Sequence, residues 1–172
     1  MHDVFGTHNA LLGLEDGLYL EAIAVDPAAP APARPRWFDL DRFAGPPRLT
    51  NWICRTENLT ATLKGGPQGL GDPVDLQRGD LRWRMAVPAS GILPFDNCAP
   101  ALIEWQTQPH PARLLPPCGV RLVRLTVRHP QADALNAALQ DRFTDARVVF
   151  ETGAAGLHAA FDTPHGPREI GA

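Results

Sequence analysis

The chain has 172 residues, of which 44% are hydrophobic and 20% charged, and its formal net charge is −3. This length and composition fit one globular domain, or two small modules that share a sheet, and are not those of a disordered chain. The mixed and slightly acidic charge argues against nucleic acid or an anionic membrane as a partner.

The sequence has no pattern typical of a membrane span, a secretion signal or a disulfide-rich protein. No apolar run approaches the length of a membrane span, and residues 1–6 have neither a basic segment nor an apolar one typical of a secretion signal. The three cysteines, Cys54, Cys98 and Cys118, form no Cys-x-x-Cys pair. A disulfide framework or a zinc knuckle is therefore not expected, and we expect a cytoplasmic protein with reduced thiols.

The first predicted element is a hairpin. Residues 7–14 and 18–25 are predicted strands, joined by a turn at Glu15-Asp16-Gly17. Because side chains alternate along a strand, Tyr19, Glu21, Ile23 and Val25 share one face of the second strand. A Pro- and Ala-rich connector follows over residues 26–35, and a short helix is predicted over residues 36–43.

The middle of the chain is predicted to alternate strands with one short helix. Strands are expected at residues 49–56, 79–88 and 101–107, with a helix that contains Leu59 and Leu63 and ends near Gly65-Gly66. In the last of these strands Glu104 lies on the face opposite Trp105.

The C-terminal part repeats this order. A strand is predicted at 120–128, a helix at 130–139, and strands at 148–151 and 157–162. Two successive βαββ units therefore follow residue 49, and the expected fold class is α+β with mixed sheets and few helices.

Two carboxylates lie inside apolar strands. Glu21 and Glu104 are costly there unless each is paired, hydrogen-bonded or coordinating, and together they suggest a shared pocket. Two such groups in one pocket would raise each other's pKa unless a cation lies between them. The alternative is that each is paired with an arginine, Arg82 or Arg84, on the strand at 79–88.

Five motifs, in the same order, carry a family resemblance. They are Gly6-Thr7-His8-Asn9-Ala10-Leu11-Leu12, Tyr19-Leu20-Glu21, Asp80-Leu81-Arg82-Trp83-Arg84, Leu102-Ile103-Glu104-Trp105 and Asp162-Thr163-Pro164-x-Gly166. Together the motifs resemble the glyoxalase-like domain proteins of the vicinal oxygen chelate superfamily.

The resemblance implies a single domain of paired βαβββ-type modules, with mixed curved sheets around a cleft. Residues 1–48 would form a partial first module, residues 49–118 the second module, and residues 119–172 a C-terminal βαββ unit. Family members begin with a strand and a helix upstream of the Gly-Thr-His-Asn stretch, so the first module is expected to be N-terminally incomplete. An open sheet edge would favour association, and a homo-oligomer, a dimer, is expected.

The resemblance also implies a ligand set. Carried over by position, Glu21, Asn51 and Glu104 would hold a divalent metal, with His8 as a possible imidazole ligand. Oxygen-rich ligands of this kind suit Zn, Mn, Fe or Ni, and a site without metal is equally open. Glu104 and Glu21 are the expected catalytic residues, and the expected substrate-binding residues are Arg82, Arg84, His8 and Trp105.

The remaining histidines are expected to lie elsewhere. His2 is expected to be a frayed surface residue, and surface or capping positions are expected for His110, His129, His158 and His165.

Two classes of function follow. The first is a metal-dependent lyase, isomerase or dioxygenase that acts on a small molecule, in which a glutamate moves the proton. The second is a metal-free protein that binds a small molecule, with Arg82 or Arg84 as the anchor for an anion. An inactive truncated form is the third possibility.

Overall fold

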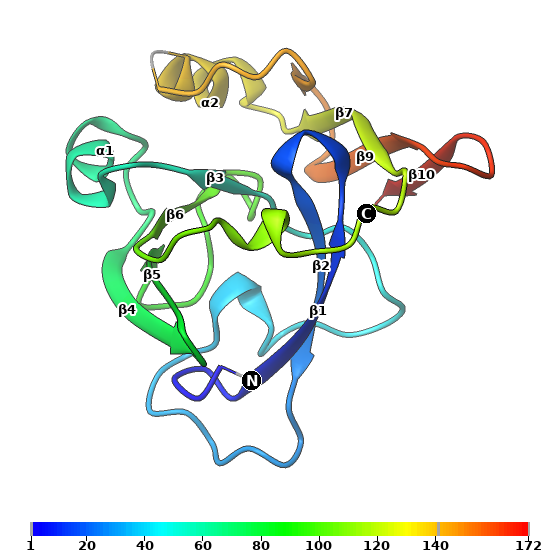
Figure 1. Cartoon of the computed structure of the whole chain (residues 1–172). Helices are drawn as coiled ribbons and strands as arrows, with labels where there is room; N and C mark the ends of the chain where they lie inside the picture. Colours follow the sequence, from blue (N-terminus) through cyan, green and yellow to red (C-terminus); the bar gives the residue numbers. More distant parts are fainter. Residues whose placement is uncertain (1, 141, 172) are drawn as a thin grey trace.

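The computed structural model describes residues 2–140 and 142–171. Over these residues the fold contains three separate β-sheets and two short α-helices. Figure 1 shows the N-terminal hairpin, in blue, between a green four-stranded sheet and a C-terminal unit in yellow to red. The arrangement is α+β with mixed sheets, which confirms the fold class predicted from the sequence.

The first sheet is the predicted hairpin. Strands β1 (Thr7–Gly13) and β2 (Tyr19–Val25) pair antiparallel, and Leu11 lies opposite Glu21. Its odd-numbered side chains are buried or half-buried, except for Val25 at the end of β2, whereas on the other face of β1 the even-numbered side chains are exposed. The hairpin therefore has one inner face, which carries Asn9, Tyr19 and Glu21.

The second sheet belongs to a βαβββ unit with the strand order β3-β6-β5-β4. Its elements are β3 (Ile53–Arg55), α1 (Leu59–Gly65), β4 (Asp72–Arg78), β5 (Leu81–Val87) and β6 (Ala101–Trp105). Strand β3 is parallel to β6, and the other pairs are antiparallel. Helix α1 begins after Asn58, whose side chain accepts a hydrogen bond from the amide of Ala61 at 2.9 Å.

The third sheet belongs to a second βαβββ unit with a different strand order, β10-β9-β7-β8. Its elements are β7 (Arg121–Arg128), α2 (Ala132–Leu139), β8 (Val148–Glu151), β9 (Gly156–Asp162) and β10 (Arg168–Gly171). Here β7 and its crossover strand β8 are direct parallel neighbours, whereas in the first unit two other strands separate β3 from β4.

Two strands are additional to the predicted βαββ pattern, and one predicted helix is much shorter than expected. Strands β4 and β10 are edge strands that the sequence pattern did not predict. The short helix expected over residues 36–43 is reduced to one 3₁₀ turn at Trp37–Asp39, because Phe38 and Asp39 both adopt a left-handed backbone with φ of 57°.

The hairpin joins the two units. At its turn the amide of Glu15 donates to the carbonyl of Val120 at 2.8 Å, and Asp16 pairs with Arg147 at 3.2 Å. At its other end Phe5 stacks on Trp37 with ring centroids 4.3 Å apart. One continuous apolar core thus connects the N-terminal segment with both units.

His2 is buried, which corrects the expectation that it frays. Only 5% of the residue is exposed, and its ring contacts Trp37 and Trp83 edge-on at 5.0 and 5.9 Å. Its Nδ1 lies 3.1 Å from the hydroxyl of Thr7. Burial lowers the pKa of the imidazole to about 4, so His2 is neutral at pH 7.

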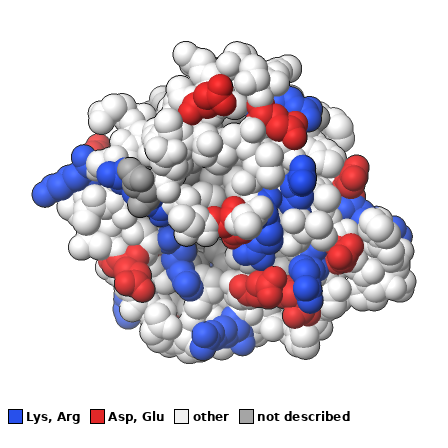
Figure 2. Space-filling model, turned by 90° about the horizontal axis from the view of Figure 1, so that it is seen from above, with Lys and Arg blue, Asp and Glu red and all other residues white. Residues whose placement is uncertain are grey.

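The structure also shows the charge distribution on the surface and the state of the cysteines. In Figure 2 acidic and basic side chains are interspersed over the face that is drawn. Cys54 and Cys98 are buried, Cys118 is half-buried, and all three are free thiols. None of the described helices has the length and apolar character needed to cross a membrane.

Candidate functional site

The inner face of the hairpin meets the second sheet, and their side chains form a candidate site. Strand β5 places Trp83 opposite Trp105 of β6, and their rings lie 5.2 Å apart. His110, in the segment after β6, contacts the ring of Trp105 at 5.8 Å and that of Tyr19 at 6.0 Å. These contacts connect the hairpin to the tryptophan face of the sheet.

Polar groups of the hairpin extend this contact. The Nδ2 of Asn9 donates to Oε1 of Glu21 at 2.6 Å, and Nη1 of Arg78, at the end of β4, donates to the Oδ1 of Asn9. We define the inner site as Asn9, Tyr19, Glu21, Arg78, Trp105 and His110. Of its members, the sequence predicted Glu21 and Trp105 as site residues.

The pKa values of three side chains of the inner site are shifted in the directions that favour their neutral forms. Burial raises the pKa of the Glu21 carboxyl, while the hydrogen bond from Asn9 and the charge of Arg78 act in the opposite direction. Burial and the neighbouring Glu21 raise the pKa of the Tyr19 phenol. Burial, with the charges of Arg55 and Arg113, lowers the pKa of His110. All three shifts favour the neutral forms of these side chains.

Glu104 does not share a pocket with Glu21. Its Oε2 accepts the amide of Leu59, the first residue of α1, at 2.7 Å, so its side chain points to the helix-covered face of the sheet. Trp105 is the next residue and therefore points to the opposite face, toward the hairpin. The second sheet thus lies between the two glutamates, and the expected shared pocket does not form.

The two expected arginines lie on the helix-covered face as well. Arg84 lies opposite Glu104 in the strand register, with 3.8 Å between Nη1 and Oε2, and its Nε is 3.4 Å from Asp75. Arg82, two residues earlier, is exposed. The arginine of the inner site is instead Arg78, which the sequence did not reveal because the strand that carries it was not predicted.

His8 and Asn51 lie away from both glutamates. His8 is exposed on the outer face of the hairpin, because its even number places it opposite Glu21. Asn51 lies two residues before Ile53, which is level with Ala101. The five residue steps from Asn51 to Glu104 along the parallel strands span roughly 16 Å. The amide of Asn51 is buried, with no hydrogen-bond partner among the described residues.

These positions do not fit a common metal ion. Ligands of one ion lie within about 2–2.6 Å of it, which a set divided between two faces of a sheet cannot satisfy. Within residues 2–140 and 142–171 there is no group of three His, Cys, Asp or Glu side chains that could hold a metal ion. The donor set inferred from the resemblance is therefore not assembled by this fold.

The missed members of the inner site carried faint signals. Asn9 lies on the same alternating face as Leu11, opposite Glu21, so a correct hairpin register would have placed the amide beside the carboxyl. His110 was expected at a surface or capping position. Its Nδ1 does accept the amide of Ala112 at 3.3 Å, as a cap does, while its ring also contacts the site.

The fold and the inner site define a class: an α+β domain of βαβββ units with a partly buried carboxyl at a sheet interface. The chain belongs to the glyoxalase-like domain family, whose model matches residues 1–143. The match covers the hairpin, the first βαβββ unit, β7 and α2, and supports the vicinal oxygen chelate resemblance. No curated protein and no solved structure gives a significant match to the chain.

Proposed function

We propose that this protein binds a small organic molecule at the inner site and that Glu21 transfers a proton to or from it, as in a lyase or isomerase. The observation that carries the proposal is the carboxyl of Glu21, half-buried on the inner face of the hairpin with a raised pKa. A carboxyl with a raised pKa exchanges a proton near neutral pH more readily than an ordinary glutamate does.

The geometry supports a defined role for each oxygen of Glu21. Oε1 is occupied by the 2.6 Å hydrogen bond from Asn9, while Oε2 has no hydrogen bond to the described residues. Oε2 is therefore the atom that exchanges the proton. Asn9 is itself fixed by Arg78, so the carboxyl is held in one orientation while the charge of Arg78 limits the rise of its pKa.

Donors at the inner site favour a molecule with an acceptor oxygen. The indole N–H of Trp105 is buried and has no partner in the part of the chain that the structure describes. Arg78 makes no ion pair with any described residue and has further N–H groups beyond the one that contacts Asn9. A carbonyl or carboxylate oxygen of a bound molecule would satisfy these donors. The raised pKa of Tyr19 keeps its phenol protonated as another donor.

The second candidate is a binding protein without catalysis. The aromatic rings of Tyr19, Trp83, Trp105 and His110 with few polar groups are typical of a site that holds a small molecule. Both candidates use the same face, and they differ in whether Glu21 exchanges a proton with the bound molecule.

The test is exchange of the methyl protons of pyruvate, a small enolisable keto acid, in deuterated buffer, followed by proton NMR. These protons lie next to the keto group. The parent protein is expected to accelerate the exchange, Glu21→Gln to lose the acceleration, and Glu104→Gln to keep it. Glu104→Gln is the matched control, because it removes the same charge on the opposite face of the sheet.

Titration of pyruvate by ligand-observed NMR separates the candidates. Binding that Trp105→Phe weakens, without exchange in the parent, would support the binding protein. If the parent neither binds pyruvate nor accelerates its exchange, or if Glu21→Gln exchanges as fast as the parent, the catalytic proposal is contradicted.

A further inference from the structure

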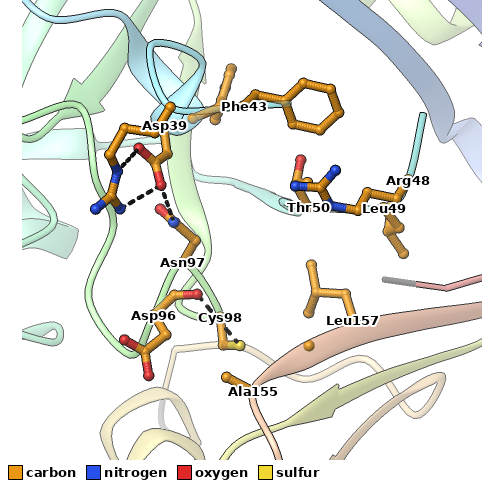
Figure 3. Close-up of a pocket in the computed structure, with 13 residues that line it drawn as sticks. Asp39, Phe43, Arg48, Leu49, Thr50, Asp96, Asn97, Cys98, Ala155 and Leu157 are labelled. Carbon is orange, nitrogen blue, oxygen red and sulfur yellow. Dashed lines mark hydrogen bonds and ion pairs between the residues drawn. The ribbon is translucent and has the colours of Figure 1, made fainter. Parts of the chain in front are cut away.

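A second pocket lies away from the inner site, between the segment 38–50, the turn at 94–98 and the start of β9. Its volume is about 170 Å³. One water needs about 10–15 Å³ on this scale, so the pocket accommodates a molecule of on the order of ten non-hydrogen atoms. We define the loop pocket by Phe43, Arg48, Thr50, Asp96, Asn97 and Leu157, which line it in Figure 3.

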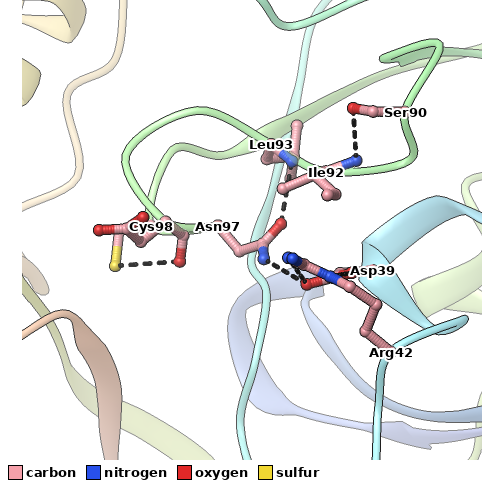
Figure 4. A network of polar contacts seen from close by, with 8 residues as sticks. Asp39, Arg42, Ser90, Ile92, Leu93, Asn97 and Cys98 are labelled. Atoms are coloured by element: carbon pink, nitrogen blue, oxygen red, sulfur yellow. Dashed lines mark hydrogen bonds and ion pairs between the residues drawn. The ribbon is translucent and has the colours of Figure 1, made fainter.

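One wall of the loop pocket is held rigidly. Asp39 receives two hydrogen bonds from Arg42, at 2.6 and 2.7 Å, and one from Asn97 at 3.2 Å. The side-chain oxygen of Asn97, Oδ1, accepts a hydrogen bond from the backbone N–H of Leu93 at 2.9 Å. Figure 4 shows these contacts as one network. The network joins two loops that are far apart in the sequence, so this wall is formed before any ligand arrives.

The backbone of the same wall is strained. Phe95, Asp96 and Asn97 are three successive residues with φ of 55°, 52° and 66°, and Asp39 opposite them has φ of 57°. Left-handed backbone at residues other than glycine costs of order 1–3 kcal/mol each and persists only where the surroundings impose it. Arg42 neutralises Asp39, so the one carboxylate of this wall without a lysine or arginine partner is that of Asp96, which is mostly exposed and lies 3.3 Å from His129.

The facing wall carries a cation. The guanidinium of Arg48 lies over the ring of Phe43 at 4.3 Å and donates one hydrogen bond, to the carbonyl of Ala44 at 2.8 Å. Arg48 forms no ion pair with any described residue, whereas the charge of Arg42 is already paired with Asp39. Figure 3 shows Arg48 and Thr50 together, across the pocket from Asp39 and Asn97.

Apolar groups complete this second wall. Phe43 is 37% exposed, and Leu49 and Leu157 also line the pocket. The pocket therefore has an unpaired guanidinium and a hydroxyl beside an apolar surface, opposite the carboxylate of Asp96.

We propose that the loop pocket binds a small carboxylate that bears an apolar group. The carboxylate contacts the guanidinium of Arg48 and the hydroxyl of Thr50, because a guanidinium binds a carboxylate in a planar two-point contact. The apolar group lies against Phe43, Leu49 and Leu157. Asp96, across the pocket, repels the carboxylate and so favours this direction of binding.

The test uses phenylacetate as the probe, with titration by ligand-observed NMR. Its uncharged analogue, phenylacetamide, has the same apolar group and nearly the same shape. Phenylacetate is expected to bind, and phenylacetamide to bind more weakly. Arg48→Gln is expected to weaken phenylacetate binding about ten-fold or more, because it removes a charge-assisted contact.

Arg121→Gln is the matched control, since Arg121 is an exposed arginine of β7 outside the loop pocket. It is expected to leave phenylacetate binding unchanged. Thr50→Val is expected to weaken the binding without changing the melting temperature, which serves as the check on folding for all variants.

Four results would overturn the proposal. They are no binding of phenylacetate, equal binding of phenylacetamide, unchanged binding by Arg48→Gln, and displacement of phenylacetate by an equal concentration of inorganic phosphate. Loss of phenylacetate binding in Glu21→Gln would also contradict it, because that result would assign the probe to the inner site. Retained binding in Glu21→Gln supports a second, independent site.

Discussion

The contact between Glu104 and the start of α1 leads to a prediction about stability. Oε2 of Glu104 accepts the amide of Leu59 at 2.7 Å, and the Leu59 residue is completely buried. Glu104→Ala would leave this amide without a partner. Losing a hydrogen bond to a charged acceptor costs about 1.5–3 kcal/mol. The partly exposed pair with Arg84, at 3.8 Å, contributes less than about 1 kcal/mol.

We therefore expect Glu104→Ala to lower the free energy of unfolding by about 2–3 kcal/mol. Glu104→Gln keeps an oxygen acceptor for Leu59 and loses only the charge, so its expected cost is about 1 kcal/mol or less. Both variants are expected to keep the activity of the inner site in folded protein, because the second sheet separates Glu104 from Glu21.

Urea denaturation at pH 7, followed by circular dichroism, measures this free energy, and an unchanged slope shows that the unfolded state is the same. The reasoning would be refuted if Glu104→Ala stayed within about 0.5 kcal/mol of the parent, which is the usual range for a surface change. It would also be refuted if Glu104→Gln were fully stable but inactive toward pyruvate, since Glu104 would then act at the inner site.

Two further predictions concern the inner site and the loops. Glu21 has a raised pKa in the fold, so the folded state holds its proton more tightly than the unfolded state, and the parent loses stability as the pH rises above the ordinary value of 4.5. Glu21→Gln cannot ionise, so its stability relative to the parent should increase from pH 4.5 to neutrality in urea titrations; a constant difference would contradict the shift. Gly91→Ala would place a Cβ 1.9 Å from the carbonyl oxygen of Arg36 and should cost more than about 2 kcal/mol. Gly17→Ala, at a similar positive φ with no atom within 4 Å, should cost only about 1 kcal/mol, and equal losses in thermal unfolding would refute the steric account.

The sequence predicted the hairpin and the buried face of Glu21 because alternation alone determines them. Residues 7–14 and 18–25 were expected as strands, and β1 and β2 fall inside these ranges. Alternation does not give the register, however, and only the register places Asn9 diagonally across from Glu21. The hydrogen bond from Asn9 that orients the carboxyl of Glu21 therefore could not be predicted from the alternating pattern.

The two missed strands share one physical cause. β4 and β10 are both edge strands, most of β4 and all of β10 are exposed, and their composition is accordingly polar. Pro73 within β4 also reads as a strand breaker, although an edge strand tolerates it. The two-residue turn at Gly79-Asp80, which joins Arg78 to Leu81, is the available signal, but the strand predicted at residues 79–88 includes both turn residues. Missing β4 concealed Arg78, and with it the inner site's own cation.

The assignment of Glu104 shows where sequence patterns stop. Alternation requires that Glu104 and Trp105 face opposite sides of the sheet, and the sequence separated them correctly. It could not show which side faces the hairpin, because both faces of β6 are covered: Leu102 is buried on one face and Ile103 on the other. A half-buried carboxylate is compatible with either side, since a helix N-terminus stabilises it as well as a functional pocket does. Glu104 faces α1, because the first amide of this helix needs an acceptor and Glu104 supplies it. A carboxylate in an apolar strand therefore marks a place where a charge is satisfied, and only the position of the neighbouring helix shows whether that place is a site or a cap.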